Sequence, residues 1–310
     1  MRRFGLDWGL SDVPTARSSH RNVTPKGGGV GILLAFLVAC LNSGVSPAYW
    51  IPVAAIALLG LASDLFDIKP QRRLIAHFII AGFLTTNLMS DGEFPSIVVA
   101  LATVLFLVGT ANFFNFMDGI NGIAAVSAIV AFGLLAGAGA IKSLENGFVE
   151  ICLGLAAASA GFLPFNLPSA RVFMGDVGSL LLGLVFGSMV IWASSGLLDA
   201  IGCAGFLLPF YVDEFNTMVV RMRRGEKLWN AHRRHLYQVL ANEVGLAHWK
   251  VTLAYGSVQL VFGGVILGLI QTNREAAALA SVIGFAVLCV TYNLLYKRFS
   301  SPAPPPTGRC

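Results

Sequence analysis

Residues 112–122 read N-F-F-N-F-M-D-G-I-N-G, and they join two long apolar runs of the chain. Asp118 therefore lies where a predicted membrane helix meets water. Three amides flank this acid: Asn112, Asn115 and Asn121. An acid and several amides at a membrane boundary are costly unless they bind something. Because capping of a helix end needs only one such residue, this stretch predicts a binding site at one end of a helix bundle.

The rest of the chain is strongly apolar. Hydrophobic residues make up 56% and charged residues 12%, with a mean hydropathy of +0.74, which is far from a soluble domain of this length. Ten apolar runs have lengths suited to bilayer-crossing helices, which need ~20 residues. They occupy residues 28–45, 49–62, 74–88, 97–114, 120–141, 148–165, 180–195, 198–220, 251–270 and 276–296. The sequence predicts an all-α fold, a polytopic membrane helix bundle with about ten transmembrane helices.

Lysine and arginine set the predicted orientation. If the N-terminus is cytoplasmic and ten helices alternate, all of the 21 lysines and arginines except Lys142 and Arg274 fall on the cytoplasmic side. Such a bias follows the positive-inside rule, so both the N- and C-termini are predicted to be cytoplasmic. The net charge of +5 reflects this orientation and does not indicate nucleic-acid binding.

One integral-membrane domain is predicted over residues 1–300. It includes a cytoplasmic N-terminal segment at residues 1–27 and a cytoplasmic catalytic loop at residues 221–250. The Pro-rich tail at residues 301–310 is expected to be disordered. The five cysteines show no C-x-x-C spacing, so neither a zinc site nor a disulfide framework is predicted.

The N-terminal segment carries D-V-P-T-A-R-S-S-H at residues 12–20 and P-K-G-G-G at residues 25–29. Arg17, His20 and Lys26 can donate to phosphate, just before a helix whose N-terminus favours anions. A basic segment beside a membrane helix also serves as a simple topology anchor. Both interpretations stay open on this segment alone.

Two more loops on the same predicted side contain acids. The loop at residues 60–73, G-L-A-S-D-L-F-D-I-K-P-Q-R-R, places Asp64 and Asp67 three residues apart. They can hold a divalent cation or pair with the nearby bases. In F-M-G-D-V-G-S, residues 173–179, Asp176 lies between two glycines at the start of a helix. It can ligate Mg²⁺ or Mn²⁺, or it can cap the helix.

The eighth apolar run carries Asp213 and Glu214 about two turns before its predicted cytoplasmic end. Intramembrane acids usually face the bundle interior and mark a functional path. Pro209 predicts a bend in this helix.

The following loop contains H-R-R-H-L-Y-Q at residues 232–238. Zinc is disfavoured at His232 and His235, because two arginines separate them and no cysteine or third histidine is near. Phosphate binding fits better. All five polar stretches fall on one predicted side, and the combination of carboxylates, amides and bases suits metal-assisted phosphate chemistry there.

Four motifs, in this order, resemble those of the polyprenyl-phosphate N-acetylhexosamine-1-phosphate transferases (glycosyltransferase family 4), which include phospho-N-acetylmuramoyl-pentapeptide transferase. The motifs are D-V-P-T-A-R-S-S-H with P-K-G-G-G, N-F-F-N-F-M-D-G-I-N-G, F-M-G-D-V-G-S and H-R-R-H-L-Y-Q. The first and last are most similar to the branch that initiates O-antigen and related surface glycans. The resemblance spans residues 12–238.

The resemblance implies a reaction. The phosphate of undecaprenyl phosphate attacks the sugar-bearing phosphorus of a UDP-N-acetylhexosamine, and UMP leaves; Mg²⁺ is required, with Mn²⁺ as the alternative. It also implies the bacterial inner (cytoplasmic) membrane, an active site facing the cytoplasm, and a role in lipopolysaccharide or cell-wall synthesis. The sugar (GlcNAc, QuiNAc, FucNAc or another) is left open, as is the oligomeric state, with a homodimer as one option.

By motif, the resemblance implies Asp64, Asp118 and Asp176 as catalytic residues, with Asp176 and Asp118 as metal ligands. The predicted substrate-binding residues are Arg17, His20, Lys26, Asn112, Asn115, Asn121, His232, Arg233 and His235.

Three features depart from the family pattern. Ser63 precedes Asp64 where the family usually has two adjacent aspartates, and Asn121 stands where an aspartate is common. Related proteins also carry a membrane helix before the D-x-P segment, and none is predicted here. The alternatives are a catalytically impaired family member, a secondary transporter, which should show internal repeats, and a membrane prenyltransferase, which needs two repeated aspartate motifs.

Overall fold

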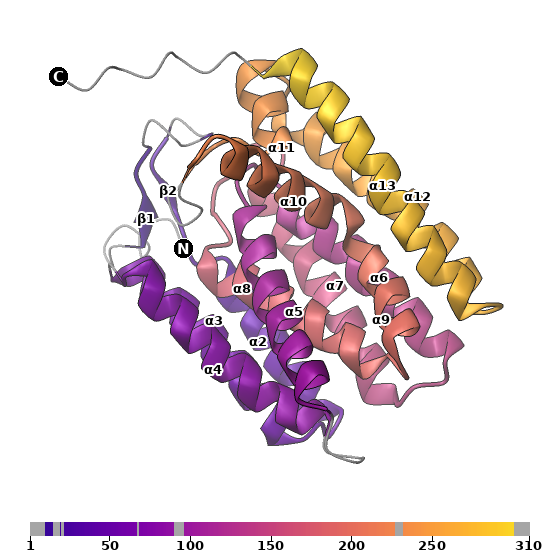
Figure 1. The fold of residues 1–310 in the computed structure, drawn as a ribbon. Coiled ribbons are helices and arrows are strands. Elements are labelled where there is room, and N and C mark those ends of the chain that lie inside the picture. Colours follow the sequence, from indigo (N-terminus) through magenta and orange to yellow (C-terminus); the bar gives the residue numbers. More distant parts are fainter. Residues whose placement is uncertain are drawn as a thin grey trace.

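The computed structural model describes residues 10–14, 19, 22–66, 68–89, 96–226 and 232–300. This part of the chain forms a helix bundle (Figure 1), as predicted. One small sheet was not predicted: β1 (Ser11–Asp12) pairs antiparallel with β2 (Thr24–Pro25). The expected absence of a membrane helix before the D-x-P segment concerns residues 1–9, and the expected disorder concerns residues 301–310. Both lie outside the described residues.

Each predicted apolar run coincides with helical structure. The helices are α2 (Gly29–Asn42), α3 (Pro47–Leu65), α4 (Pro70–Leu88), α5 (Ile97–Phe116), α6 (Ile123–Ile141), α7 (Asn146–Asn166), α8 (Asp176–Trp192), α9 (Leu197–Ala204), α10 (Leu208–Arg223), α11 (Leu236–Gln238), α12 (His248–Ile270) and α13 (Arg274–Phe299). A π-helical turn, Val239–Glu243, follows α11.

The eighth run is two helices rather than one bent helix. α9 and α10 are joined by a 3₁₀ turn at Gly205–Leu207, and Pro209 lies in the first turn of α10. Proline is tolerated there because a backbone N–H in the first turn of a helix has no hydrogen-bond partner within that helix, so its absence costs little. The predicted bend is therefore a break just before Pro209.

Six helices in the described part of the chain are long and apolar enough to cross a membrane: α3, α5, α6, α7, α12 and α13. α2 and α8 are shorter apolar helices. Large apolar side chains are exposed on outer helices, for example Phe83 on α4, Val261 on α12 and Leu294 on α13. An apolar exterior of this kind suits contact with lipid.

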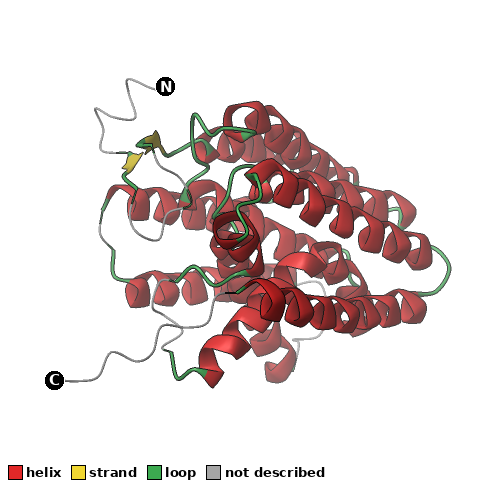
Figure 2. Ribbon diagram, turned by 90° about the horizontal axis from the view of Figure 1, so that it is seen from above, coloured by secondary structure: helices red, strands yellow, loops and turns green. Residues whose placement is uncertain are grey.

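Helix α8 forms the centre of the bundle. Every residue from Val177 to Val190 is buried, and α2, α3, α5 and α6 all pack against it. Figure 2 shows the helix bundle from above. Because α8 is enclosed, its first residue, Asp176, is held in a fixed place at one end of the bundle.

The N-terminal segment is joined to the start of α8 by backbone hydrogen bonds. Phe173 N–H donates to the carbonyl of Pro25 (2.8 Å), and Gly28 N–H donates to the carbonyl of Phe173 (2.9 Å). Two predicted polar stretches, P-K-G-G-G and F-M-G-D-V-G-S, are thereby brought side by side.

Candidate active site

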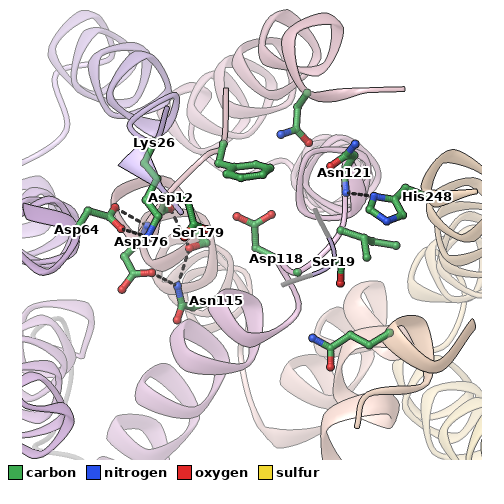
Figure 3. Close-up of a pocket in the computed structure, with 16 residues that line it drawn as sticks. Asp12, Ser19, Lys26, Asp64, Asn115, Asp118, Asn121, Asp176, Ser179 and His248 are labelled. Atoms are coloured by element: carbon green, nitrogen blue, oxygen red, sulfur yellow. Dashed lines mark hydrogen bonds and ion pairs between the residues drawn. The ribbon is translucent and has the colours of Figure 1, made fainter. Parts of the chain in front are cut away.

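A polar cavity of about 230 Å³ opens where the ends of α3, α5 and α8 meet the N-terminal segment (Figure 3). Its lining brings together residues far apart in sequence. They are Asp12, Ser19, Lys26, Asp64, Asn115, Asp118, Gly119, Ile120, Asn121, Asn166, Phe173, Gly175, Asp176, Ser179, Gln238 and His248. The three acids predicted to be catalytic all reach this one cavity.

Asp176 is bound from two sides. Arg73 on α4 pairs with its Oδ2 (Nη2 to Oδ2, 2.7 Å), and the Asn115 amide on α5 donates to its Oδ1 (2.9 Å). The same amide donates to the Ser179 hydroxyl (2.8 Å). Gly175 precedes the acid with φ of +75°, a conformation that a residue without Cβ adopts at low cost. The helix start also favours the negative charge.

Asp64 holds the start of α8 from α3. Its Oδ2 accepts the backbone N–H of Asp176 (2.9 Å), and Lys26 lies 3.5 Å from its Oδ1. One turn earlier, Gly60 packs on the backbone of Asp176, so closely that a Cβ there would lie 2.6 Å from the Asp176 carbonyl carbon. The two helices can approach this far only because residue 60 has no side chain.

Asp118 differs from the other two acids. It lies in the turn between α5 and α6, and among the described residues its carboxylate accepts no hydrogen bond and pairs with no base. Burial raises its pKa well above the usual carboxyl range, and the charges of Asp176 and Asp64 raise it further. A cation bound in the cavity would therefore favour the ionised form of Asp118.

The carboxylate oxygens of these acids are the type of ligand that a hard divalent cation binds. Mg²⁺ and Mn²⁺ prefer carboxylate oxygens, retain water and take further ligands from substrate phosphates. In the described part of the chain, no group of three His, Cys, Asp or Glu side chains forms a metal site by itself. Asp118 and Asp176 would therefore hold such an ion together with substrate oxygens and water.

On the far side of the cavity, the turn between α5 and α6 is held in place by hydrogen bonds of Asn121 and Asn166. Asn121 N–H donates to Nδ1 of His248 on α12 (3.3 Å), and its side chain donates to the carbonyl of Pro168 (3.1 Å). Asn166 at the end of α7 accepts from the N–H of Gly122 (2.5 Å). This turn connects α5 to α6 directly beside Asp118.

Comparison with known proteins decides the family. Residues 46–194, which include all three acids, match the glycosyl transferase family 4. An undecaprenyl-phosphate alpha-N-acetylglucosaminyl 1-phosphate transferase of Thermotoga maritima is 31% identical over 288 residues, which cover 92% of this chain and 89% of the relative. The chain belongs to glycosyl transferase family 4.

More distant relatives agree. A probable undecaprenyl-phosphate N-acetylglucosaminyl 1-phosphate transferase of Bacillus subtilis is 24% identical, with 84% of this chain and 78% of the relative covered. A phospho-N-acetylmuramoyl-pentapeptide-transferase of Enterococcus faecalis is 28% identical, with 83% and 87% covered. The family predicted from the motifs is confirmed, and the transporter and prenyltransferase alternatives fall away.

Some predicted family residues lie apart from the cavity. Asn112 is one turn before Asn115 on α5, and its amide contacts Nδ1 of His77 (3.2 Å) and the carbonyl of Val108 (2.7 Å). Arg17 and His20 lie outside the described residues, as does Asp67. Lys26, Asn115 and Asn121 do line the cavity.

The H-R-R-H-L-Y-Q segment lies beside the cavity and contributes its last residue to the lining. His235 is buried, with Nδ1 3.2 Å from Asp213 and Nε2 3.5 Å from Glu214. His232 packs against the His235 ring at a centroid distance of 4.8 Å, and Arg233 is exposed. None of the three lines the cavity, whereas Gln238 at the end of the motif does.

Ser63 does not replace the acid that the family usually has there. Its hydroxyl donates to the carbonyl of Leu59 on its own helix (2.9 Å), and the residue is not part of the cavity lining. Asp12, by contrast, does line the cavity, together with Asp64.

Several residues at the site are not predicted from the sequence. In the sequence, Arg73 contributes to the orientation signal and is a possible partner for the acids of its own loop, whereas in the structure it pairs with Asp176. His248 and Asn166 give no signal, because each is a single polar residue near the end of an apolar run. Ser179 and Phe173 lie within a quoted motif, so attention to every polar or aromatic position of that motif could have found them.

Proposed function

We propose that this chain transfers N-acetylhexosamine-1-phosphate from a UDP-sugar to undecaprenyl phosphate. A phosphate oxygen of the lipid forms a bond to the sugar-bearing phosphorus, and the bond from that phosphorus to the oxygen of UMP breaks. The products are a lipid-linked sugar diphosphate and UMP. Relatives named for this reaction with N-acetylglucosamine support the proposal.

The observation that carries the proposal is the convergence of Asp64, Asp118 and Asp176 on one cavity that also holds Lys26. Lys26 can bind phosphate oxygens, and Asp64 holds it in place. Arg73 and Asn115 fix the Asp176 carboxylate. A magnesium ion on Asp118 and Asp176 would supply charge neutralisation of the diphosphate.

The lipid acceptor requires an apolar path to this site. An apolar groove of about 470 Å³ lies between α5, α9, α10 and α13, with Phe113 and Tyr211 in its lining. Helix α5 carries both the groove and, at its end, Asn115. We assign the polyprenyl chain to this groove, so that its phosphate reaches the cavity along α5.

The same proposal includes the orientation. Ten helical segments cross the bacterial inner membrane, with both termini and the cavity on the cytoplasmic side. The distribution of lysine and arginine supports this arrangement, as do the six helices whose length and composition allow a crossing. A nucleotide-sugar donor is then reached from the compartment in which it is made.

The test is a UMP-release assay of detergent-solubilised protein with undecaprenyl phosphate, Mg²⁺ and a panel of UDP-N-acetylhexosamines. We expect UMP release that needs both lipid and metal, and the best donor names the sugar. The variant Asp176→Asn should abolish it. A fully active Asp176→Asn protein would overturn the metal assignment.

A catalytically impaired member is the second candidate, because Ser63 supplies no carboxylate and its hydroxyl donates to the carbonyl of Leu59. Folded wild-type protein that releases no UMP with any donor, while a relative purified and assayed in the same way is active, would favour this candidate.

A further inference from the structure

The carboxylate of Asp213 on α10 accepts hydrogen bonds from several elements, and Asp213 is not part of the cavity lining. Only 1% of this residue is exposed. Its Oδ1 accepts from the N–H of Leu236 (3.0 Å) and the Thr217 hydroxyl (3.2 Å), and lies 3.2 Å from Nδ1 of His235. Its Oδ2 accepts from the Tyr255 hydroxyl and the N–H of Tyr237.

Five donors fill the acceptor capacity of a carboxylate, which has about four lone-pair sites. Asp213 therefore has no acceptor capacity left for a metal or substrate. Two of the five donors are backbone amides at the start of α11. These amides have no carbonyl partner within their own helix, so Asp213 fixes the backbone of the His235–Gln238 segment.

Tyr237 connects this segment to the turn that carries Asp118. Its hydroxyl donates to the carbonyl of Phe116 (2.9 Å), at the end of α5. A Cβ at Gly119 would lie 2.2 Å from the same hydroxyl. The Tyr237 ring is fully buried, and it stacks on His235 with a centroid distance of 5.4 Å. Asp118 lies between these two contacts in sequence.

We propose that Asp213 is a positioning residue for the transfer reaction, acting through Tyr237 on the turn that carries Asp118. The inference rests on the proposed function, and it deepens it by assigning H-R-R-H-L-Y-Q a new task. The segment holds the Asp118 turn in place and brings Gln238 to the cavity. A displacement of a reacting group by about 1 Å costs on the order of a hundredfold in rate.

The test compares two variants of α10. In Asp213→Asn, one carboxylate oxygen becomes an NH₂ group, which cannot accept from two donors. The matched control is Asn216→Ala, because Asn216 is also buried and binds Asn293 and Cys289 on α13 but nothing on α11. Tyr237→Phe is the second probe, since it keeps the ring and removes the hydroxyl that bonds to the Phe116 carbonyl and to the Gly119 backbone. The melting temperature of each variant is measured first, so that activities are compared at a temperature where all of the proteins are equally folded.

We expect Asp213→Asn to lower kcat at least tenfold and to raise the half-saturating Mg²⁺ concentration severalfold. We expect Tyr237→Phe to change both in the same direction, and the double variant to be no worse than Asp213→Asn alone, because both act along one path. Asn216→Ala should change the melting temperature alone. If Asp213→Asn matches Asn216→Ala in kcat and in Mg²⁺ dependence, the inference is wrong.

Hydrogen exchange separates this inference from the proposed function, because it needs no activity. In Asp213→Asn, amide exchange should accelerate both at residues 236–238 and at residues 117–122. Acceleration confined to residues 236–238 would show that Asp213 does not act on the Asp118 turn. An inactive wild-type protein would count against the proposed function, and the exchange result would still decide the role of Asp213.

Discussion

Substitution of Gly60 by alanine tests whether the spacing between α3 and α8 sets the activity. A Cβ at residue 60 would lie 2.6 Å from the carbonyl carbon and oxygen of Asp176 and 2.8 Å from the nitrogen of Val177. Ordinary contact begins at 3.4 Å, so the backbones must separate by about 0.8 Å. All of these neighbours are backbone atoms of the buried α8, which cannot rotate away as a side chain would.

The separation acts directly on two of the acids proposed to be catalytic, Asp64 and Asp176. Asp64 lies one turn after Gly60 on the same helix, and its Oδ2 accepts the Asp176 N–H at 2.9 Å. Moving α3 outward stretches this bond, and moving α8 displaces Asp176 from Arg73. We expect overpacking to cost about 1–3 kcal/mol of stability. A displacement approaching 1 Å should lower kcat on the order of a hundredfold.

The assay is UMP release measured beside thermal unfolding in the same detergent. Gly82→Ala on α4 is the control, because a Cβ added at residue 82 would meet no heavy atom of the described residues within 4 Å and alanine favours helix by up to about 1 kcal/mol. It should keep full activity. A folded Gly60→Ala protein within twofold of the wild type would refute the argument that this helix contact positions Asp64 and Asp176.

Three further outcomes are expected. Ser63→Asp should keep or raise activity, and a large loss would show that the first loop has been rebuilt around serine. Burial and the charges of Asp176 and Asp64 raise the pKa of Asp118, and protons compete with the cation for its oxygens. Activity should therefore fall on acidification, and less so at high Mg²⁺; superimposable pH profiles at two Mg²⁺ concentrations would contradict this. Burial alone would lower the pKa of His235, but the hydrogen bond to Asp213 and the carboxylates of Asp213 and Glu214 raise it. A raised folded-state pKa stabilises fully below the unfolded value of about 6.5, and this stabilisation is lost as pH rises through the folded value. The melting temperature should decline with pH above about 6.5, and His235→Gln should flatten that decline.

The positions of the helices could be predicted from the sequence, and so could the location of the acids at one end of the bundle. Long apolar runs admit few alternatives in a membrane, and each predicted run is helical. A polar residue at the end of a run must then lie at an end of the bundle. The distribution of lysine and arginine assigned Asp64, Asp118 and Asp176 to one side of the membrane, and the family resemblance assigned them to one site; all three line one cavity.

The partners of these residues could not be predicted, because they depend on how helices distant in sequence pack. Arg73 and Asp176 are separated by most of four helices in the chain, and only the packing of α4 beside α8 joins them. Asp213 has the sequence features of a functional intramembrane acid. Its five donors come from α10, α12 and the segment after residue 234, a convergence that no local pattern encodes.

The three acids have different tasks although they share a cavity. The carboxylate of Asp64 is occupied by the Asp176 amide and by Lys26, and that of Asp176 by Arg73 and Asn115. The protein itself therefore holds both of these carboxylates in place. Asp118 has no such partner in the described chain, so its ionised form would be stabilised by a cation that enters the cavity. We therefore propose that Asp118 is the acid whose charge depends most on a bound cation, and that the fixed carboxylates of Asp64 and Asp176 would determine where that cation meets the diphosphate.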